Sequence, residues 1–243
     1  MQFTDLRYDP RDKARALVNL GLAYEGLGRS DEAVEATLSS IPLFRQCGDR
    51  RAEAMAYTNL AIAYRTLGLL QSVDESCCQA IELAKRLGDS HLQAHVLNLL
   101  GQNRIATTDF QSARLCHLEA LALSHSLGEA RSEGEALFGL AICSENERNW
   151  QESADHYRKC LQVEKDLGER GAEAYVLNNL GRVCFELDLF DEAAQHWKRA
   201  LDIFSSMDSE FAAIRASELS STLQSMKENQ MLSPEDWDSL QRR

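Results

Sequence analysis

The chain has 243 residues, of which 38 are acidic and 26 are basic, so its formal net charge is −12. This excess of negative charge repels phosphate backbones, and we expect no direct binding to nucleic acid. No stretch approaches the length of about 18 consecutive apolar residues that a membrane span needs. Residues 1–20 also lack the apolar core of a signal peptide. We therefore expect no membrane insertion and a cytoplasmic or nuclear location, in which the seven cysteines are reduced thiols.

A glycine followed by an acidic residue recurs every 40 residues, beginning at Gly48, Gly88, Gly128 and Gly168. Glycine in this place can adopt the left-handed conformation that closes one helix, and aspartate after it can cap the next. The period predicts an N-terminal extension, residues 1–9, followed by five units of two helices each. These units are 10–49, 50–89, 90–129, 130–169 and 170–208.

Three further features lie outside this regular pattern. Ser209 can cap a final helix, 209–228, with one apolar face and one polar face, as the last unit of a stack of repeats requires. In the tail, residues 229–243, Pro234 follows a serine and could begin a short helix. Pro42 predicts a kink or an early end, near Ile41, in the second helix of the first unit.

The fifth unit has the clearest pattern. Small residues at Gly181, Ala193 and Ala200 would let its two helices approach closely, while Trp197 and Leu201 fill the space between them. This arrangement resembles the tetratricopeptide repeat (TPR) family. The resemblance implies an all-α, right-handed superhelical TPR solenoid of antiparallel helix pairs with a C-terminal capping helix.

The repeat length of 40, together with Asn-Leu-Gly in the first helix, resembles the subclass found in LGN/Pins adaptors and kinesin light chains, over about residues 10–208. That resemblance implies an adaptor that binds an extended or helical protein segment in a concave groove lined by the first helices. Asparagine offers two donors and an acceptor to a peptide backbone, and arginine can select carboxylates. The side chains predicted to bind the partner are Arg15, Asn19, Asn59, Arg65, Asn98, Gln102, Asn178, Asn179 and Arg182. For each asparagine the alternative is that its amide ties adjacent helices together.

We expect binding to concentrate in the fifth unit and the stack to be loosest in the first, which contains Pro42. The net charge favours a partner with basic residues, and we expect a monomer. Two other classes of function remain open. One is a ligand- or peptide-responsive regulatory domain that acts on a separate output protein, and the other is a self-associating assembly module.

No catalytic motif is present, so the sequence predicts a protein that is not an enzyme and has no cofactor. His91 and His95 are spaced to share a helix face, but no thiol or carboxylate completes a metal site there, and we interpret them as a polar helix edge. Cys116 and His117 are neighbours in a helix and point in different directions, which favours packing over a nucleophile and base pair.

Overall fold

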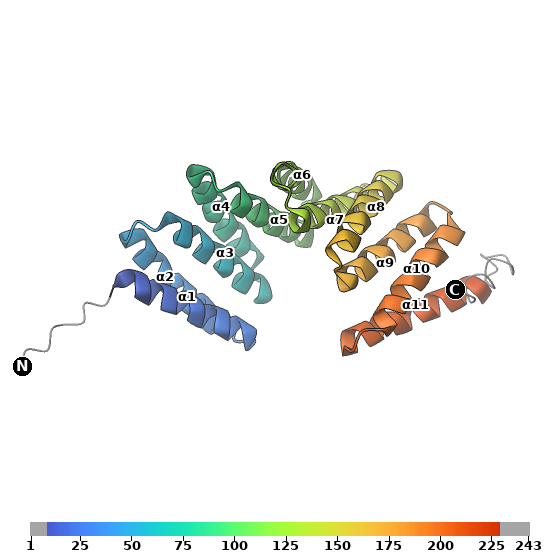
Figure 1. Cartoon of the computed structure of the whole chain (residues 1–243), viewed down its shortest axis with the longest axis horizontal. Helices are drawn as coiled ribbons and strands as arrows, with labels where there is room; N and C mark the ends of the chain where they lie inside the picture. The colour runs from blue at the N-terminus through green and yellow to red at the C-terminus, as the bar shows by residue number, and fades with distance from the viewer. Residues whose placement is uncertain (1–8, 229–243) are drawn as a thin grey trace, which may run out of the picture. The chain divides into compact units, whose positions relative to one another are not determined.

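The computed structural model describes residues 9–228, so the short helix predicted in the tail and nearly all of the predicted N-terminal extension lie outside the described residues. Within this range the chain forms eleven helices and no strand (Figure 1). Their bounds are α1 Pro10–Gly26, α2 Ser30–Gln46, α3 Arg50–Thr66, α4 Leu70–Leu87, α5 Ser90–Ala106, α6 Phe110–Leu127, α7 Ala130–Asn146, α8 Trp150–Leu167, α9 Arg170–Glu186, α10 Phe190–Ser205 and α11 Glu210–Glu228.

The glycine and aspartate signals act as the sequence predicts. Gly88 closes α4 and Gly168 closes α8 in the left-handed conformation, with φ of 66° and 72°. The side chain of Asp49 accepts a bond of 3.2 Å from the amide of Ala52, and that of Asp89 accepts one of 3.1 Å from Leu92. These bonds satisfy amides at the start of α3 and α5 that have no partner within the helix.

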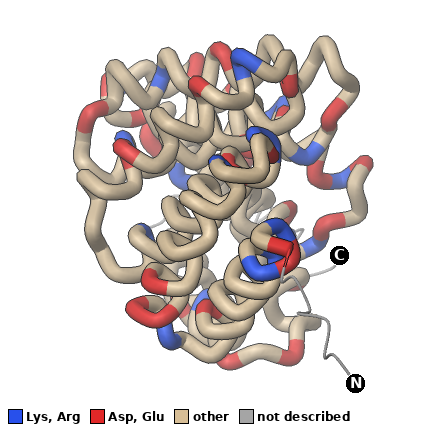
Figure 2. The backbone as a smooth tube through the Cα atoms, turned by 90° about the vertical axis from the view of Figure 1, so that its left-hand side faces the viewer, with Lys and Arg blue, Asp and Glu red and all other residues tan. Residues whose placement is uncertain are grey.

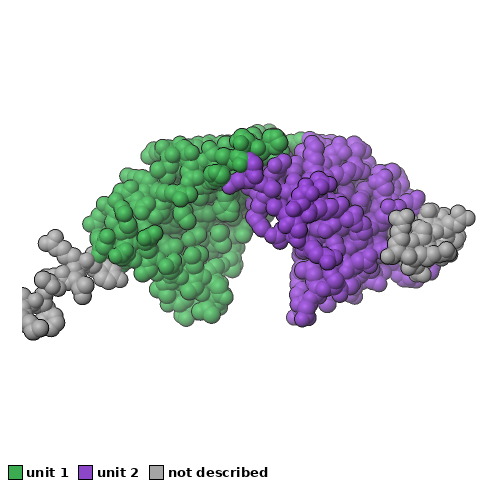
Figure 3. All heavy atoms as spheres, viewed as in Figure 1, with its two compact units in different colours: residues 1–127 green, residues 128–243 purple. Residues whose placement is uncertain are grey.

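The chain divides into two compact units, residues 1–127 and 128–243 (Figure 3). Unit 1 contains α1 to α6 and unit 2 contains α7 to α11, so the division falls where the third predicted repeat ends. Within each unit every helix packs against the next one in the chain, and a short turn reverses the direction between partners. This confirms an all-α fold of stacked helix pairs, while the superhelical sense stays a prediction.

Glycines in the first helices allow this packing. A Cβ atom built on Gly181 would lie 2.7 Å from Trp197 Cδ1, and one on Gly101 would lie 2.5 Å from His117 Nε2. Ordinary contacts begin at 3.4 Å, so only glycine fits beneath these rings. The predicted pairing of a small residue with a large one is confirmed in α9–α10 and recurs in α5–α6.

Arginines at the start of the first helices join successive pairs. Arg11 contacts the Asp49 carboxylate at 3.7 Å, Arg51 contacts Asp89 at 2.8 Å, and Arg131 contacts Glu169 in unit 2. The three arginines occupy equivalent positions, 40 or 80 residues apart. Each pair has a solvent-exposed arginine and contributes little, at most about 1 kcal/mol.

Of the two alternatives predicted for the second helix of the first repeat, an end near Ile41 is wrong, because α2 continues through Pro42 to Gln46. A kink at Pro42 stays a prediction. Pro42 is exposed, and so is Leu38, whose carbonyl group loses its helical partner at that point. Water can reach this carbonyl, which lowers the cost of continuing the helix.

The predicted capping helix is confirmed as α11. Its first turn is held by Ser209, whose Oγ accepts a bond of 3.1 Å from the Ala212 amide. Ala212, Leu219, Leu223 and Met226 form the buried side. In unit 1, α1 buries Ala14 and Gly21 and leaves Leu22 51% exposed, as expected of a helix that packs against its neighbours from one side only. That the first repeat is the loosest stays a prediction.

Candidate functional site

Tyr175, Asn179 and Arg182 lie at steps of four and three on α9, so they share one side of the helix. We call this side, together with the adjoining side chains Phe211, Ile214 and Arg215 of α11, the fifth-repeat face. Two of the residues on α9, Asn179 and Arg182, were predicted from the sequence. Tyr175 and the contribution of α11 were not.

The position of Arg182 is set by a buried carboxylate. Its Nη1 lies 2.5 Å from Glu145 Oε2, and the hydroxyl of Tyr157 donates to Glu145 Oε1 at 2.5 Å. Burial, followed by the charge of Glu145, raises the pKa of Tyr157, so this phenol stays protonated and remains a donor. The chain Tyr157, Glu145, Arg182 connects α8, α7 and α9 within unit 2.

Asn179 is oriented from both of its ends. Its Nδ2 donates to the Tyr175 carbonyl at 2.9 Å, and its Oδ1 accepts from Arg182 Nη2 at 3.2 Å. The side chain of Arg182 is 52% exposed, so part of its guanidinium faces solvent. The neighbouring Asn178 is half-buried, and its backbone carbonyl accepts a bond of 3.0 Å from Trp197 Nε1.

Apolar surface lies beside these polar groups. The rings of Tyr175 and Phe211 stack with centroids 5.7 Å apart and an angle of 18°, and the Arg215 guanidinium lies 5.2 Å from the Phe211 centroid. Tyr175 is 37% exposed, Phe211 45% and Ile214 52%. The spacing of Phe211 and Arg215 by four on a helix was the signal in the sequence that could have indicated this part of the site.

In unit 1 the predicted residues are more dispersed. Arg65 Nη1 of α3 donates to Gln102 Oε1 of α5 at 2.8 Å, which brings two of them together. Arg15 and Asn19 are exposed on α1, and Asn59 is half-buried on α3.

The prediction that Asn98 contacts a partner is wrong, because this side chain is 0% exposed. Its Oδ1 lies 3.1 Å from Nδ1 of His117, so the amide ties α5 to α6, which is the structural alternative. Burial lowers the pKa of His117 to about 4, and the ring is therefore neutral at physiological pH. Burial also raises the pKa of Cys116 to about 11, so this neighbour is a neutral thiol and not the thiolate that a nucleophilic cysteine requires.

Charges of both signs are interspersed along the helices (Figure 2). Many form pairs, such as Lys85 with Glu119 at 3.0 Å and Arg104 with Asp74 at 2.8 Å. His91 and His95 are both exposed on α5. Between residues 9 and 228 no helix combines the length and the apolar character needed to cross a bilayer.

Several solved structures share this fold. A signal transduction ATPase with a tetratricopeptide repeat sensor from Pyrococcus horikoshii has a TM-score of 0.73 and 17% identity, covering 86% of this chain and 31% of that protein. The kinesin light chain TPR-like repeats of Podosopora anserina have a TM-score of 0.67 and 16% identity, and the match covers 81% of this chain and 96% of theirs. Aspartyl phosphate phosphatase F of Bacillus subtilis has a TM-score of 0.77 and 12% identity, and the match covers 95% of this chain and 60% of that protein. At these identities the similarity shows the fold alone.

No curated protein matches the chain. The tetratricopeptide repeat family model matches residues 12–73 and 132–206, one segment in each unit. These segments make up more than half of the 243 residues, and both consist of the helix pairs described above. The chain therefore belongs to the tetratricopeptide repeat family, whose repeats typically form non-catalytic scaffolds for protein interactions.

Proposed function

We propose that this protein is an adaptor that holds an extended or helical segment of another protein on the fifth-repeat face. The observation that carries the proposal is the exposed apolar surface of Tyr175, Phe211 and Ile214 beside the oriented polar groups of Asn179 and Arg182. Exposed apolar side chains that adjoin each other on two packed helices are typical of interaction sites, whereas scattered ones are not.

The polar and apolar parts would contribute differently. Tyrosine and arginine are enriched among the residues that dominate binding energies, because they bury a large area and still form hydrogen bonds. Asn179 and Arg182 are already oriented by their contacts, so binding would cost less side-chain entropy than it would with free side chains. The net charge of −12 favours a segment with basic residues, while Arg182 and Arg215 on the face itself would contact carboxylates of that segment. Added salt should weaken both kinds of contact.

The experiment selects short peptides from a displayed library on the wild-type protein and measures their affinity by fluorescence polarisation. The test variant combines Tyr175→Ala, Asn179→Ala and Arg182→Ala. A matched control replaces exposed residues of α10, Gln195→Ala and Asp202→Ala.

We expect the triple variant to lose affinity by at least about tenfold, since a few central residues carry most of the binding energy. The control should bind as the wild type does. Selected peptides that bind the triple variant and the wild type equally well would place the binding surface elsewhere and refute the proposal.

A second candidate is a regulatory module that responds to a ligand. It is favoured by the similarity to the P. horikoshii protein, whose repeats are described as a sensor. Small-angle scattering separates the two candidates, because a rigid adaptor keeps its dimensions when the selected peptide is added and a responsive module changes them.

A further inference from the structure

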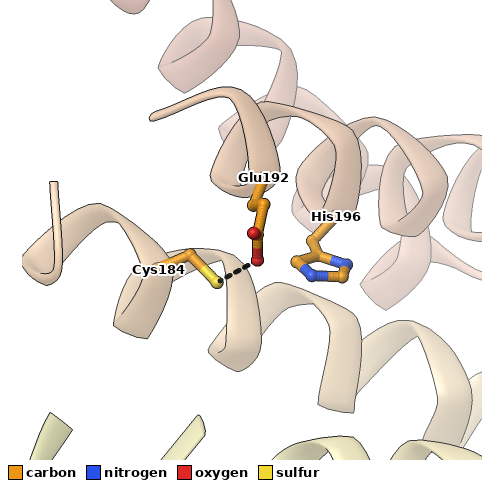
Figure 4. Close-up of side chains that lie close together, drawn as sticks. All are labelled: Cys184, Glu192 and His196. Carbon is orange, nitrogen blue, oxygen red and sulfur yellow. Dashed lines mark hydrogen bonds between the residues drawn. The ribbon is translucent and has the colours of Figure 1, made fainter. Parts of the chain in front are cut away.

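Cys184, Glu192 and His196 converge beside the turn between α9 and α10, and none of them belongs to the fifth-repeat face (Figure 4). Cys184 lies near the end of α9, while Glu192 and His196 are four residues apart and share one side of α10. One ligand atom from each side chain lies within 4.8 Å of the other two. No other group of three His, Cys, Asp or Glu side chains within residues 9–228 meets this criterion.

These side chains are suitable ligands for a zinc ion. Cysteine thiolate, imidazole nitrogen and carboxylate oxygen are the three protein ligands that zinc prefers. A thiolate and a carboxylate together carry a charge of −2, which balances the divalent ion. Cys184 is buried and Glu192 is exposed, so the ion would lie at the edge of the unit, with a fourth position open to water.

The distances between the three ligand atoms need only a small change to accommodate a zinc ion. Zinc bonds of about 2.0 Å to nitrogen and oxygen and 2.3 Å to sulfur place these three ligand atoms roughly 3.3–3.5 Å apart in a tetrahedral site. Cys184 Sγ already lies 3.9 Å from Glu192 Oε2. Rotation of the Glu192 and His196 side chains can provide the remaining approach, at most about 1.5 Å for any pair of ligand atoms.

The guanidinium of Arg158 would compete with a metal ion for the Glu192 carboxylate. Arg158 Nη2 lies 3.4 Å from Glu192 Oε2, and Arg158 Nη1 donates to Asp155 Oδ1 at 3.2 Å. The side chain of Arg158 is partly exposed. It can therefore keep its contact with Asp155 when Glu192 turns toward an ion.

The fourth repeat offers an internal comparison. Exactly 40 residues earlier, Ser144, Glu152 and His156 occupy the equivalent positions. Ser144 Oγ donates to Glu152 Oε2 at 3.1 Å, and His156 Nε2 lies 3.8 Å from Glu152 Oε1. The two clusters differ in one ligand, because a neutral hydroxyl stands where Cys184 supplies a thiol that can bind zinc as thiolate.

We propose that Cys184, Glu192 and His196 form a zinc site that fastens the end of α9 to the start of α10. Binding releases the thiol proton of Cys184 to solvent and forms one bond each from sulfur, oxygen and nitrogen to the ion. No oxidation or reduction occurs. The ion then stabilises unit 2, since the folded state holds the three ligands together and the unfolded chain does not.

The test titrates the reduced full-length protein with Co²⁺, which reports a bound thiolate by a charge-transfer band in the near ultraviolet, and then adds Zn²⁺ in competition. The variants are Cys184→Ser, His196→Ala and, as a control for an unrelated exposed thiol, Cys78→Ser. Serine is tolerated at the equivalent position of the fourth repeat, so Cys184→Ser should fold. A fourth variant, Ser144→Cys, supplies the missing thiol to the fourth repeat.

We expect one Co²⁺ per chain, displaced by Zn²⁺, and a weakening of roughly a hundredfold or more in Cys184→Ser and His196→Ala. Cys78→Ser should bind as the wild type does, and Ser144→Cys should bind a second ion. Absence of the band in the wild type, or a band that survives in Cys184→Ser, would overturn the proposal. A single bound ion in Ser144→Cys would also count against it, because the same three ligand types would then fail to make a site.

Discussion

Replacing Gly181 with alanine tests whether the close approach of α9 and α10 stabilises unit 2. The added Cβ would lie 2.7 Å from Trp197 Cδ1, whereas ordinary contact begins at 3.4 Å, so the indole must move by about 0.7 Å. Trp197 is buried and its Nε1 donates to the Asn178 carbonyl, so movement also strains a hydrogen bond. Overpacking of this kind costs about 1–3 kcal/mol.

Alanine favours a helix over glycine by up to about 1 kcal/mol, which offsets part of this cost. We therefore expect Gly181→Ala to lower the free energy of unfolding by roughly 1–2 kcal/mol. Gly171→Ala is the matched control on the same helix, because its Cβ would meet only Met207 Cε, at 3.5 Å. That variant should be neutral or slightly more stable than the wild type.

Urea denaturation followed by tryptophan fluorescence measures both variants. All three tryptophans lie in residues 128–243, so the signal reports unit 2. If Gly181→Ala were as stable as Gly171→Ala, the space between Gly181 and Trp197 would accommodate a Cβ atom, and the argument that only glycine fits there would be refuted.

Three further predictions concern the rest of the chain. Thr108 has a φ of 62° at the position where the first two repeats have Gly28 and Gly68. Thr108→Gly should therefore stabilise unit 1 by up to about 1 kcal/mol, and Gly68→Thr should destabilise it. Thermal denaturation followed by circular dichroism compares the two variants, and effects of the same sign would contradict the argument that Thr108 is strained. Because burial lowers the pKa of His117 from 6.5 to about 4, the folded protein keeps this ring neutral while the unfolded chain protonates it. Stability from this source is complete above pH 6.5 and falls as the pH drops toward 4, by roughly 3 kcal/mol in total. The urea midpoint of His117→Gln should therefore depend less on pH over this interval, and an unchanged slope would exclude the explanation. The protein should remain a monomer in analytical ultracentrifugation at moderate concentration, and a stable dimer would support the self-association class instead.

Part of the candidate site could be predicted from the repeat register. Asn179 and Arg182 lie on an accessible side of α9 as expected. Asn98 and Asn178 occupy equivalent positions in their repeats, 80 residues apart. Asn98 is nevertheless fully buried, because its side chain pairs with His117, which occupies the large-residue position of α6. The position of a residue within its repeat specifies the direction of its side chain, but the size and polarity of the neighbouring side chain decide whether it reaches solvent.

The sequence by itself determined the period, most of the helix boundaries and the pairing of glycine with a large ring, whereas it did not predict that α2 continues past Pro42. These features depend on contacts within one repeat, where local spacing is sufficient. It also indicated Ser209 as the start of the capping helix, because capping is a local interaction.

Only the tertiary structure decided which side chains meet across helices that are distant in sequence. The contact of Arg182 with Glu145 spans 37 residues, and the stacking of Tyr175 on Phe211 spans 36. The convergence of Cys184 with Glu192 and His196 likewise depends on how α9 packs on α10. Such contacts follow from the distance and rotation between packed helices, which the pattern of apolar residues constrains only loosely.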